Sequence, residues 1–577
     1  MNARTLMELW LCALGVAASG IASGQSVLTH QFPGGGWGAI EAPQEHISEA
    51  QQHALWQTIQ SSIQTLYARG KLAEPKAGLP IRFAWPTRLA HGRPEFHDHA
   101  VSNYIDQDPV LNSARDFSCG TRTYDLANAG GGHKGTDITL GFRPFYQQDA
   151  EEVVVVAAAP GTIVAKDDAQ PDRSCGDLST LLANPMLKNN VISIRHADGS
   201  VAHYYHVKTG SLTAKNIGDT VVEGEYLGAI GSAGFSSGPH LHFELRSPTN
   251  AVIDPWAGAC NYATPVSLWK AQEPYHVQEI MDLMPSSTTP TAENMDTTCT
   301  NNVAVNKPGS GYLQPNLHAQ PGVPHNFVAF LRDIDVASQV VLSLRRPDGS
   351  LYATVTAAAP GYSPMAYVYV NGAIPASEPA GKWSFAVTYG GATRSVPFYF
   401  NVPAPSSIRV YEFHNRNLDH YFRTATAAEA QSLTPGSGFL PTGDDFFALE
   451  RTVELAGVSP ACRFYGSTTP GPNSHFYTAD PTECALLRAI EVQTPPSVPR
   501  WNYEENAFAA YVPVDGVCPA EAPIPLYRLY NQQGSDNKAG SQSDGNHRFT
   551  TLSSVYNHME AKGWIGEGVV MCAQAKP

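Results

Sequence analysis

The stretch Gly238–Leu245, which reads GPHLHFEL, is the feature that most constrains the fold of this chain. Apolar and polar residues alternate along it, and successive side chains of an extended strand point to opposite faces. One face then carries three apolar side chains that can join a core: Leu241, Phe243 and Leu245. The other face carries three polar side chains: His240, His242 and Glu244. We expect a strand that presents two imidazoles on one face.

The sequence around this stretch predicts an antiparallel, mainly β domain over residues 79–264. Residues 153–167 are typical of a strand, a Pro-Gly turn and a second strand. Residues 190–208 are typical of a hairpin closed by an Asp-Gly turn. One element before this domain differs, because Ser48–Arg69 combines a capping box with apolar residues at helical spacing and is followed by a glycine. We expect a helix there, within an N-terminal helical segment at residues 25–78.

The length of 577 residues predicts several domains rather than one core. A linker is expected at residues 265–310, because Ser286–Pro308 is rich in Ser, Thr, Asn and Pro. Alternation returns at residues 311–403 and predicts an immunoglobulin-like β-sandwich. Residues 408–577 contain three similar units, each with two strands, a short helix and a further strand, which predicts a pseudo-threefold module. The second strand of each unit holds one histidine: His420, His475 and His547. Candidate helix caps occur in two units: Thr426 with Glu429, and Asp480 with Glu483.

The N-terminus and the charge indicate where the protein works. Residues 1–24 combine Arg4, a short apolar run and small residues at a cleavage site, which is typical of a secretory signal peptide. No later segment has the ~18 uninterrupted apolar residues of a membrane-spanning helix. The net charge of −15 argues against general nucleic-acid binding, which relies on an excess of basic residues. We expect an exported protein, periplasmic or extracellular, with no nucleic-acid partner and no integral membrane span.

Eight cysteines remain once Cys12 leaves with the signal peptide, four in each half of the chain. An exported chain with an even count is typical of disulfide bonding. We expect two bridges in each half, and the spacing does not choose between the connectivities. The cysteines are Cys119, Cys175, Cys260 and Cys299, then Cys462, Cys484, Cys518 and Cys572.

A second polar cluster supplies partners for His242. In GGGHKGTDITL, His133 and Asp137 are four residues apart, so an extended backbone places both side chains on one face. Imidazole nitrogen and carboxylate oxygen bind zinc at about 2.0–2.2 Å. Three protein ligands leave a fourth tetrahedral position for water, which indicates a catalytic rather than a structural zinc site. We expect one zinc ion.

The segment HYYHVK offers a further histidine. His203 and His206 are three residues apart, so on a strand they face opposite ways and only one can reach the site. Glu244 shares a face with His242, and we expect it to orient a ligand. A solvent-facing carboxylate is the alternative.

Three segments carry a resemblance to a known family. GHKGTD, YYHVK and GSAGFSSGPHLHFEL are similar to the HxxxD, YxH and GxxGxSxGPHLHxE signatures of the lysostaphin-like zinc endopeptidases, which include the LytM-type murein hydrolases. The resemblance runs from about Arg82 to Asn261 and implies a metallopeptidase domain at residues 79–264 that cuts peptide bonds in peptidoglycan. It implies three zinc ligands: His133, Asp137 and His242. It implies two catalytic histidines that do not bind zinc: His206 and His240.

Several alternatives stay open. A relative of this family could be a non-catalytic wall-binding adaptor, or a secreted protease of glycine-rich proteins. The segment His97-Asp98-His99 could bind a metal or lie in a polar surface loop. The histidines of the C-terminal units could bind a metal or sugar, or reflect packing repeated by duplication. Aromatic side chains there could stack on cell-wall glycan or form the core: Tyr411, Tyr465, Tyr527, Trp501 and Trp564.

Overall fold

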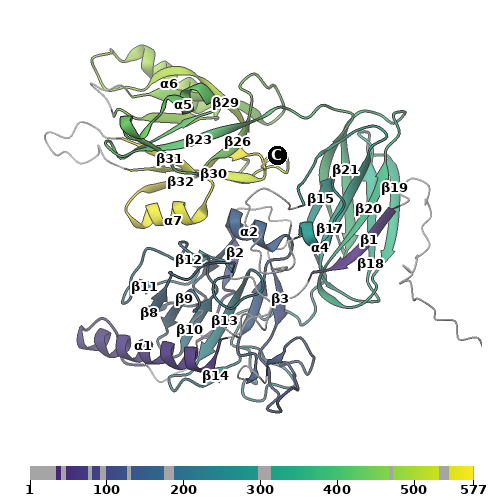
Figure 1. Cartoon of the computed structure of the whole chain (residues 1–577), viewed down its shortest axis with the longest axis vertical. Helices are drawn as coiled ribbons and strands as arrows, with labels where there is room; N and C mark the ends of the chain where they lie inside the picture. Colours follow the sequence, from purple (N-terminus) through teal and green to yellow (C-terminus); the bar gives the residue numbers. More distant parts are fainter. Residues whose placement is uncertain are drawn as a thin grey trace, which may run out of the picture.

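The computed structural model describes most of the chain and arranges it in three bodies (Figure 1). The described residues are 34–40, 47–75, 81–90, 96, 99–126, 131–173, 188–295, 313–466, 472–531 and 545–575. The expected signal peptide lies outside them, as do His97, Asp98, Cys175 and Cys299. Within these ranges no helix has the length and apolar character needed to cross a membrane. The prediction of a multidomain, mainly β protein with antiparallel sheets is confirmed.

The first body is built on an eight-stranded sheet of order β11-β8-β9-β10-β13-β6-β3, with β14 beside β13. A second, three-stranded sheet of order β12-β7-β2 packs against it. The large sheet comprises β11 (Thr220–Val221), β8 (Gly161–Asp167), β9 (Val191–Arg195), β10 (Val201–Tyr205), β13 (His240–Arg246), β6 (Thr136–Thr139), β3 (Ala100–Asn103) and β14 (Val252–Ile253). The small sheet comprises β12 (Tyr226–Ala229), β7 (Val153–Val156) and β2 (Thr87–Leu89). As expected from the alternation, three side chains of β13 enter the core: Leu241, Phe243 and Leu245.

Helix α1 (Glu49–Ala68) forms where the sequence predicts it, with the capping box of Ser48 and Gln51 intact. Its apolar stripe packs on the large sheet through Ile59, Ile63 and Leu66. The strand register places Tyr205 opposite both Val191 and His242, so these three side chains share one face. Ile47 and Leu55 pack against Tyr205 and Val191. The helix therefore covers part of the face that carries His242.

The second body is a β-sandwich of two sheets, of order β1-β20-β17-β15 and β16-β22-β21-β18-β19. The first sheet comprises β1 (Gly34–Ala39), β20 (Ser363–Ala373), β17 (Pro324–Ile334) and β15 (Glu279–Ser286). The second comprises β16 (His318–Ala319), β22 (Ala392–Phe400), β21 (Gly381–Tyr389), β18 (Gln339–Arg345) and β19 (Leu351–Ala358). Its core is strongly aromatic and includes Phe327, Trp383 and Phe398.

Two strands of this sandwich lie outside the range that the sequence predicts. Residues 279–286 were expected in the linker but form β15, where a bulge between Ile280 and Asp282 breaks the period-two pattern. The glycine-rich strand β1 was expected in a helical segment. Its glycines are needed because a Cβ on Gly38 would lie 2.3 Å from the ring of Tyr367. Close packing, rather than strand propensity, selects that sequence.

The third body is the C-terminal module, and its register shows which residues of the three units correspond. Tyr411, Cys462 and Tyr527 pair with Thr424, Thr478 and Thr550. Tyr421 therefore corresponds to His475 and His547, while His420 corresponds to Ser474 and Asn546. The alignment of His420 with the other two histidines is off by one residue. The pseudo-threefold symmetry itself holds.

A cyclic set of hydrogen bonds closes the three units around their axis. The His420 side chain bonds the carbonyl of Asn473 at 3.0 Å. Ser474 donates to the carbonyl of Gly545, and Asn546 donates to the carbonyl of Asp419 at 3.1 Å. Each unit thus contacts the next and the third returns to the first. The short helices are α5 (Ala427–Ser432), α6 (Pro481–Gln493) and α7 (Ser553–Ala561).

Disulfides link elements within the first and third bodies. Cys119 pairs with Cys260, Cys462 with Cys484, and Cys518 with Cys572. The C-terminal half therefore holds the two bridges expected of it.

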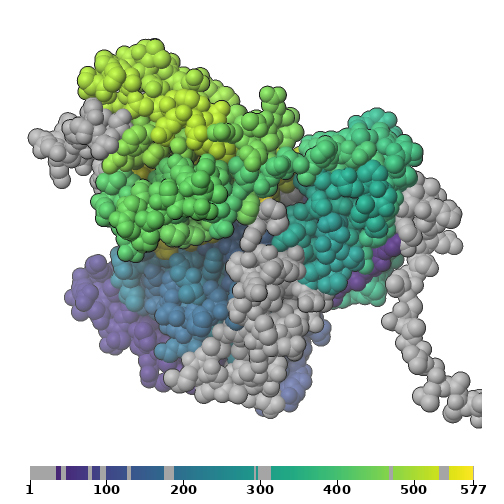
Figure 2. Space-filling model, turned by 45° about the horizontal axis from the view of Figure 1, so that its top comes forward, coloured from purple at the N-terminus to yellow at the C-terminus, as the bar shows by residue number. Residues whose placement is uncertain are grey.

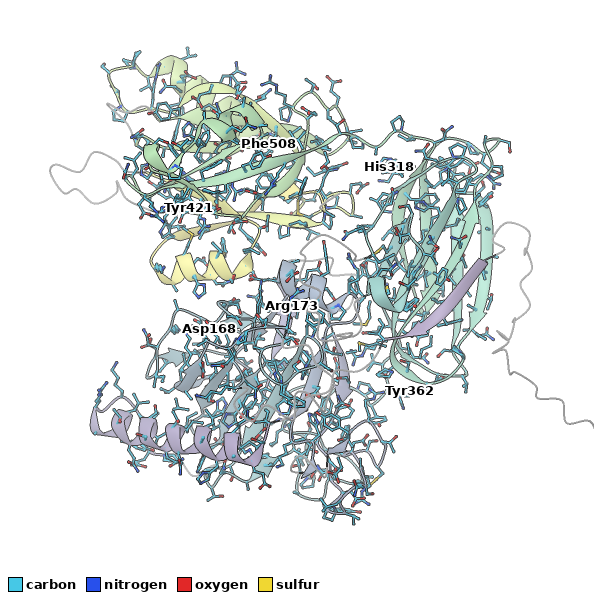
Figure 3. All side chains as sticks on the ribbon, viewed as in Figure 1. Asp168, Arg173, His318, Tyr362, Tyr421 and Phe508 are labelled. Atoms are coloured by element: carbon cyan, nitrogen blue, oxygen red, sulfur yellow. A yellow bond between two sulfur atoms is a disulfide. The ribbon has the colours of Figure 1, made fainter. Side chains whose placement is uncertain are left out.

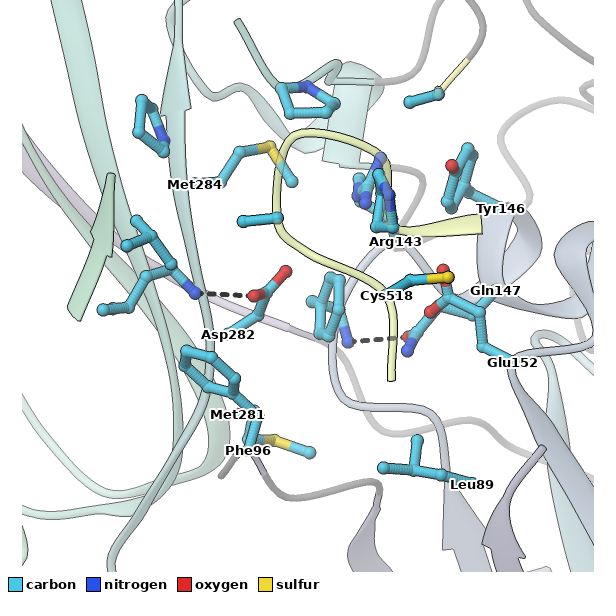
Figure 4. A pocket seen from close by; sticks show the side chains of 18 of the residues that line it. Leu89, Phe96, Arg143, Tyr146, Gln147, Glu152, Met281, Asp282, Met284 and Cys518 are labelled. Atoms are coloured by element: carbon cyan, nitrogen blue, oxygen red, sulfur yellow. Dashed lines mark hydrogen bonds between the residues drawn. The ribbon is translucent and has the colours of Figure 1, made fainter. Parts of the chain in front are cut away.

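Several contacts join the three bodies. Arg122 of the first body bonds Asp333 and Tyr362 of the sandwich, and Tyr362 lies at the sandwich end that faces the first body (Figure 3). All three bodies line a cavity of about 120 Å³, with Arg143, Asp282 and Cys518 in its wall (Figure 4). The C-terminal module lies directly on the first body through α7 (Figures 1 and 2).

Glu151 fixes α7 to the first body. Only 2% of this residue is exposed, and its carboxylate accepts from the backbone N–H of Ser554 at 2.7 Å and from the hydroxyls of Ser553 and Ser554. Lys208 pairs with the same carboxylate at 2.8 Å. A carboxylate from one domain thus takes the place of an N-cap for a helix of another.

The three helices differ in how their first turns are capped. As expected, Asp480 accepts from the first-turn N–H groups of α6. Thr426, expected to cap α5, makes no side-chain capping bond. The N-cap of α7 is Leu552, which has no polar side-chain atom, so the cap of this helix comes from Glu151.

Candidate metal centre

Three expected ligands converge on one point of the large sheet. His242 on β13 lies directly opposite Asp137 on β6 in the strand register, and His133 precedes β6. Asp137 Oδ1 lies 3.0 Å from His133 Nε2 and 3.0 Å from His242 Nδ1, and the two nitrogens are 3.1 Å apart. All three residues are buried. In the part of the chain that the structure describes, they are the one trio of His, Cys, Asp or Glu side chains suited to a metal ion.

The second nitrogen of each histidine decides what these three atoms can do. His133 Nδ1 lies 2.7 Å from the carbonyl of Tyr104, which can only accept, so Nδ1 carries the proton. His242 Nε2 lies 3.3 Å from the carboxylate of Glu244 and carries the proton in the same way. In the neutral rings, His133 Nε2 and His242 Nδ1 are then both unprotonated. Two lone pairs and a carboxylate about 3 Å apart repel one another unless a cation lies between them.

These separations fit a zinc ion. In a tetrahedral site with bonds of about 2.0–2.1 Å, neighbouring donor atoms are about 3.3–3.4 Å apart. The three measured separations are a few tenths of an ångström shorter. Two imidazole nitrogens and one carboxylate oxygen are donors that zinc prefers, and three protein donors are the number typical of a catalytic zinc.

Asp137 is held by a residue that no sequence motif selects. Asn103 on β3 donates to Asp137 Oδ2 at 3.0 Å, which leaves Oδ1 facing the two histidines. Burial raises the pKa of Asp137, whereas His133 and His240 lower it when their rings carry a positive charge, and the pKa lies well below its ordinary value. Asn103 belongs to no motif. Only the antiparallel pairing of β3 with β6 brings it here.

Glu244 is buried with 1% exposure, so the alternative of a solvent-facing carboxylate is wrong. It contacts His242 on one side and bonds Arg246 on the other. Burial raises its pKa, yet hydrogen bonding to His242 and the charge of Arg246 bring the pKa down to about 2. The carboxylate is ionised and fixes which nitrogen of His242 faces the centre.

His206 and His240 lie side by side next to the three ligands, with ring centroids 4.6 Å apart. His206 Nδ1 bonds the carbonyl of Ala233 at 2.8 Å, and His240 Nδ1 bonds that of Gly238 at 2.8 Å. His240 Nε2 lies 3.8 Å from Asp137 Oδ1. Both rings therefore adjoin the centre.

The argument that His203 and His206 face opposite ways is wrong. His203 lies opposite Glu244 in the register, so it is on the same face as the ligands, where it bonds Ser193. Strand β10 ends at Tyr205, and His206 has φ of 62°, a left-handed backbone that turns its side chain back toward the site. Burial lowers the pKa of His203 to about 4. The His203 ring bonds Ser193 and does not belong to the cluster of candidate ligands.

The other candidate histidines lie elsewhere. His99 is buried rather than in a surface loop, stacked on Trp85 and 3.4 Å from Glu273. His475 and His547 stack on the tyrosine opposite each in the register, at 4.9 and 4.8 Å. Burial lowers the pKa of both histidines to about 3, so they are neutral packing groups.

The antiparallel sheet and the buried His₂Asp centre place this body in the class of β-sheet metallopeptidase domains. Residues 131–255 match the model of peptidase family M23, and this part of the chain is an M23 domain. Residues 383–491 and 489–576 match a domain of unknown function, DUF5648.

Curated relatives match short stretches of the chain. The DD-carboxypeptidase/endopeptidase Mpg of Neisseria meningitidis serogroup B is 41% identical over 66 residues, which cover 11% of this chain and 14% of Mpg. The cell division protein DipM of Caulobacter vibrioides is 41% identical over 61 residues, 10% of each chain. The chain thus spans about a seventh or less of the length of these relatives. A solved structure of a putative M23 peptidase from Pseudomonas aeruginosa aligns with 34% of this chain and 60% of its own chain. The sequence identity is 17% and the TM-score is 0.16.

Proposed function

We propose that this chain is an exported zinc metalloendopeptidase that hydrolyses peptide bonds in peptidoglycan stem peptides or crosslinks. One observation carries the proposal: donor atoms of His133, Asp137 and His242 lie 3.0–3.1 Å apart, with the lone pairs of both neutral rings turned to one point. The M23 match supports peptide hydrolysis. Mpg, named as a carboxypeptidase and endopeptidase, supports the same chemistry.

The metal chemistry rests on three side chains and their partners. When bound, a zinc ion supplies Lewis acidity, which polarises a carbonyl and activates water near neutral pH. His133 and His242 would hold it through neutral nitrogens, and Asp137 adds one negative charge. The Tyr104 carbonyl and the Glu244 carboxylate keep both rings in the required orientation.

His206 and His240 would act as the general base and general acid. Because backbone carbonyls accept from Nδ1–H of both rings, the lone pair of each neutral ring is on Nε2. An imidazole beside the centre can take a proton from the attacking water and give it to the departing amine. As an imidazolium it can stabilise negative charge on the carbonyl oxygen of the substrate.

The test is digestion of purified sacculi followed by mass spectrometry of the released muropeptides. We expect new peptide amines from the native protein and none from His242→Ala, together with loss of stoichiometric zinc. His53→Ala, which changes an exposed histidine of α1, is the matched control and should keep both. Activity that survives a chelator, or full activity in His242→Ala, would refute the proposal.

Simple assays distinguish the proposed function from two alternatives. A non-catalytic adaptor predicts no zinc and no cleavage, although the complete ligand set argues against it. A secreted protease of glycine-rich proteins would share the site chemistry. A panel of pentaglycine peptide, a stem-peptide crosslink and casein distinguishes these substrates, and we expect the crosslink to be cut fastest.

We propose that the C-terminal module anchors the enzyme to cell-wall glycan through its half-buried aromatic side chains. Tyr527 is excluded from this role because it is buried in the interface, where it donates to the carbonyl of Ala90 at 3.1 Å. Trp501 and Trp564 are half-buried and available. Sacculus pull-down of His242→Ala, with and without Trp501→Ala and Trp564→Ala, tests the proposal, and unchanged retention would refute it.

A further inference from the structure

A pocket adjoins the metal centre on the same face of the sheet. Its volume is about 250 Å³, larger than engineered cavities of about 150 Å³ that bind benzene. One wall is α1, and the other is formed by β8, β9 and β10. Its apolar lining includes Ile47, Ala54, Leu55, Val191, Tyr205 and Ile217.

Two wall residues connect the pocket to the catalytic groups. The ring of Tyr205 is part of the wall and lies 5.6 Å from the ring of His242. Asn189 is also part of the wall, and its side-chain oxygen accepts from the backbone N–H of Phe235 at 3.3 Å. Phe235 lies in the loop that leads to His240. A chain lying across the centre would therefore pass the mouth of this pocket.

The helix that closes the pocket lies outside the region that matches the M23 family model. The M23 match covers residues 131–255, whereas α1 is Glu49–Ala68. The helix is firmly placed, because Gln52 accepts from Arg246 at 3.0 Å and Tyr67 accepts from Arg195 at 2.7 Å. Since Arg246 also bonds Glu244, the wall of the pocket and the metal centre share one set of supports.

We propose that this pocket is a substrate subsite that receives a long aliphatic side chain of the peptide, next to the scissile bond. The inference rests on the proposed peptidase function and adds to it the kind of residue selected. Apolar walls favour methylene groups, while the exposed polar residues Thr58 and Lys188 form a solvent-exposed rim for a polar end of the side chain. Glycine or alanine would leave the pocket unfilled.

The test uses glycine peptides in which one residue on either side of the cleaved bond is alanine, norleucine or lysine. We expect kcat/KM for norleucine and lysine to exceed that for alanine at least about tenfold at one position. Ala54→Trp should fill the pocket and remove this preference, while zinc content and thermal stability stay unchanged. Gln64→Trp, on the exposed side of α1, is the matched control and should keep the preference.

Each outcome decides the matter. Equal rates for all three residues at every position would overturn the subsite and leave the peptidase intact. A preference that survives Ala54→Trp would place selectivity elsewhere and also overturn it. If the zinc-loaded native protein cuts no peptide of the panel and no sacculi, the proposed function fails, and the subsite fails with it.

Discussion

Replacing Glu151 with glutamine should release the C-terminal module from the M23 domain. The Glu151 carboxylate accepts three hydrogen bonds from the start of α7 and pairs with Lys208 at 2.8 Å, with 2% of the residue exposed. Removing one partner of a buried ion pair costs about 3–5 kcal/mol, because it leaves the other charge uncompensated. At 1.4 kcal/mol per factor of ten, the undocked population should rise by roughly two to three and a half orders of magnitude.

Hydrogen exchange measures this population directly. The amide of Ser554, which donates to Glu151 in the native protein, should lose protection in Glu151→Gln. Amides in the core of the module, such as that of Phe508, should keep theirs, because the module's own core is untouched. The comparison separates undocking from unfolding.

The matched control is Glu223→Gln, which breaks an exposed pair with Lys270 at 2.6 Å on the same domain. Exposed pairs contribute about 0–1 kcal/mol, so protection at Ser554 should not change. If Glu151→Gln exchanges at Ser554 as slowly as the native protein does, the cap supplied by Glu151 is not what holds the module, and the reasoning fails.

Three further predictions concern other parts of the molecule. Asn103→Ala removes the hydrogen bond to Asp137 Oδ2, so zinc affinity should fall about 10–100-fold in chelator competition, and unchanged affinity would contradict the role of Asn103. Gly135→Ala would place a Cβ 2.5 Å from His242 Nε2, so the purified protein should contain little zinc by elemental analysis. Full zinc occupancy would contradict this, because it would mean that the backbone at residue 135 can move away from His242. Burial lowers the pKa values of His475 and His547 in the folded protein to about 3, from the ordinary 6.5. Their contribution to the free energy of unfolding is therefore complete above pH 6.5 and is lost as the pH falls toward 3. Calorimetry should show the module melting at lower temperature across that window, with a shallower slope in His475→Phe/His547→Phe, and an equal slope would refute the assignment.

The sequence predicts the clustering of the three candidate ligands because the alternation that orients each of them is local. Asp137 and His242 each lie on a strand whose alternation sets the face, and the motifs around them are distinctive. The supports of the centre are not local. Asn103 and the carbonyl of Tyr104 reach it only because β3 pairs with β6 and the following chain passes His133. No spacing rule within the motifs connects them to it.

His206 shows where periodicity stops being a guide. The alternation argument assumes an extended backbone through residue 206, but the strand ends one residue earlier and φ becomes positive. The histidine that alternation would turn away from His242 is thereby turned back beside His240. Left-handed backbone at a non-glycine residue is costly and is retained where surrounding contacts fix it. Here the bond from His206 Nδ1 to Ala233 is such a contact.

Domain order along the sequence also differs from domain structure in space. The first sheet of the sandwich takes β1 from before the M23 domain and β15 from after it, so the M23 domain is inserted within the sandwich. These two strands are the opposite edges of a four-stranded sheet, about 14 Å apart at the usual strand spacing. Both ends of the inserted domain are therefore attached to one sheet of the sandwich, while Glu151 attaches the module to the inserted domain. The proposed subsite beside α1 belongs to a domain that both other bodies hold in place, so substitutions at these junctions should alter substrate selection without touching the candidate metal ligands.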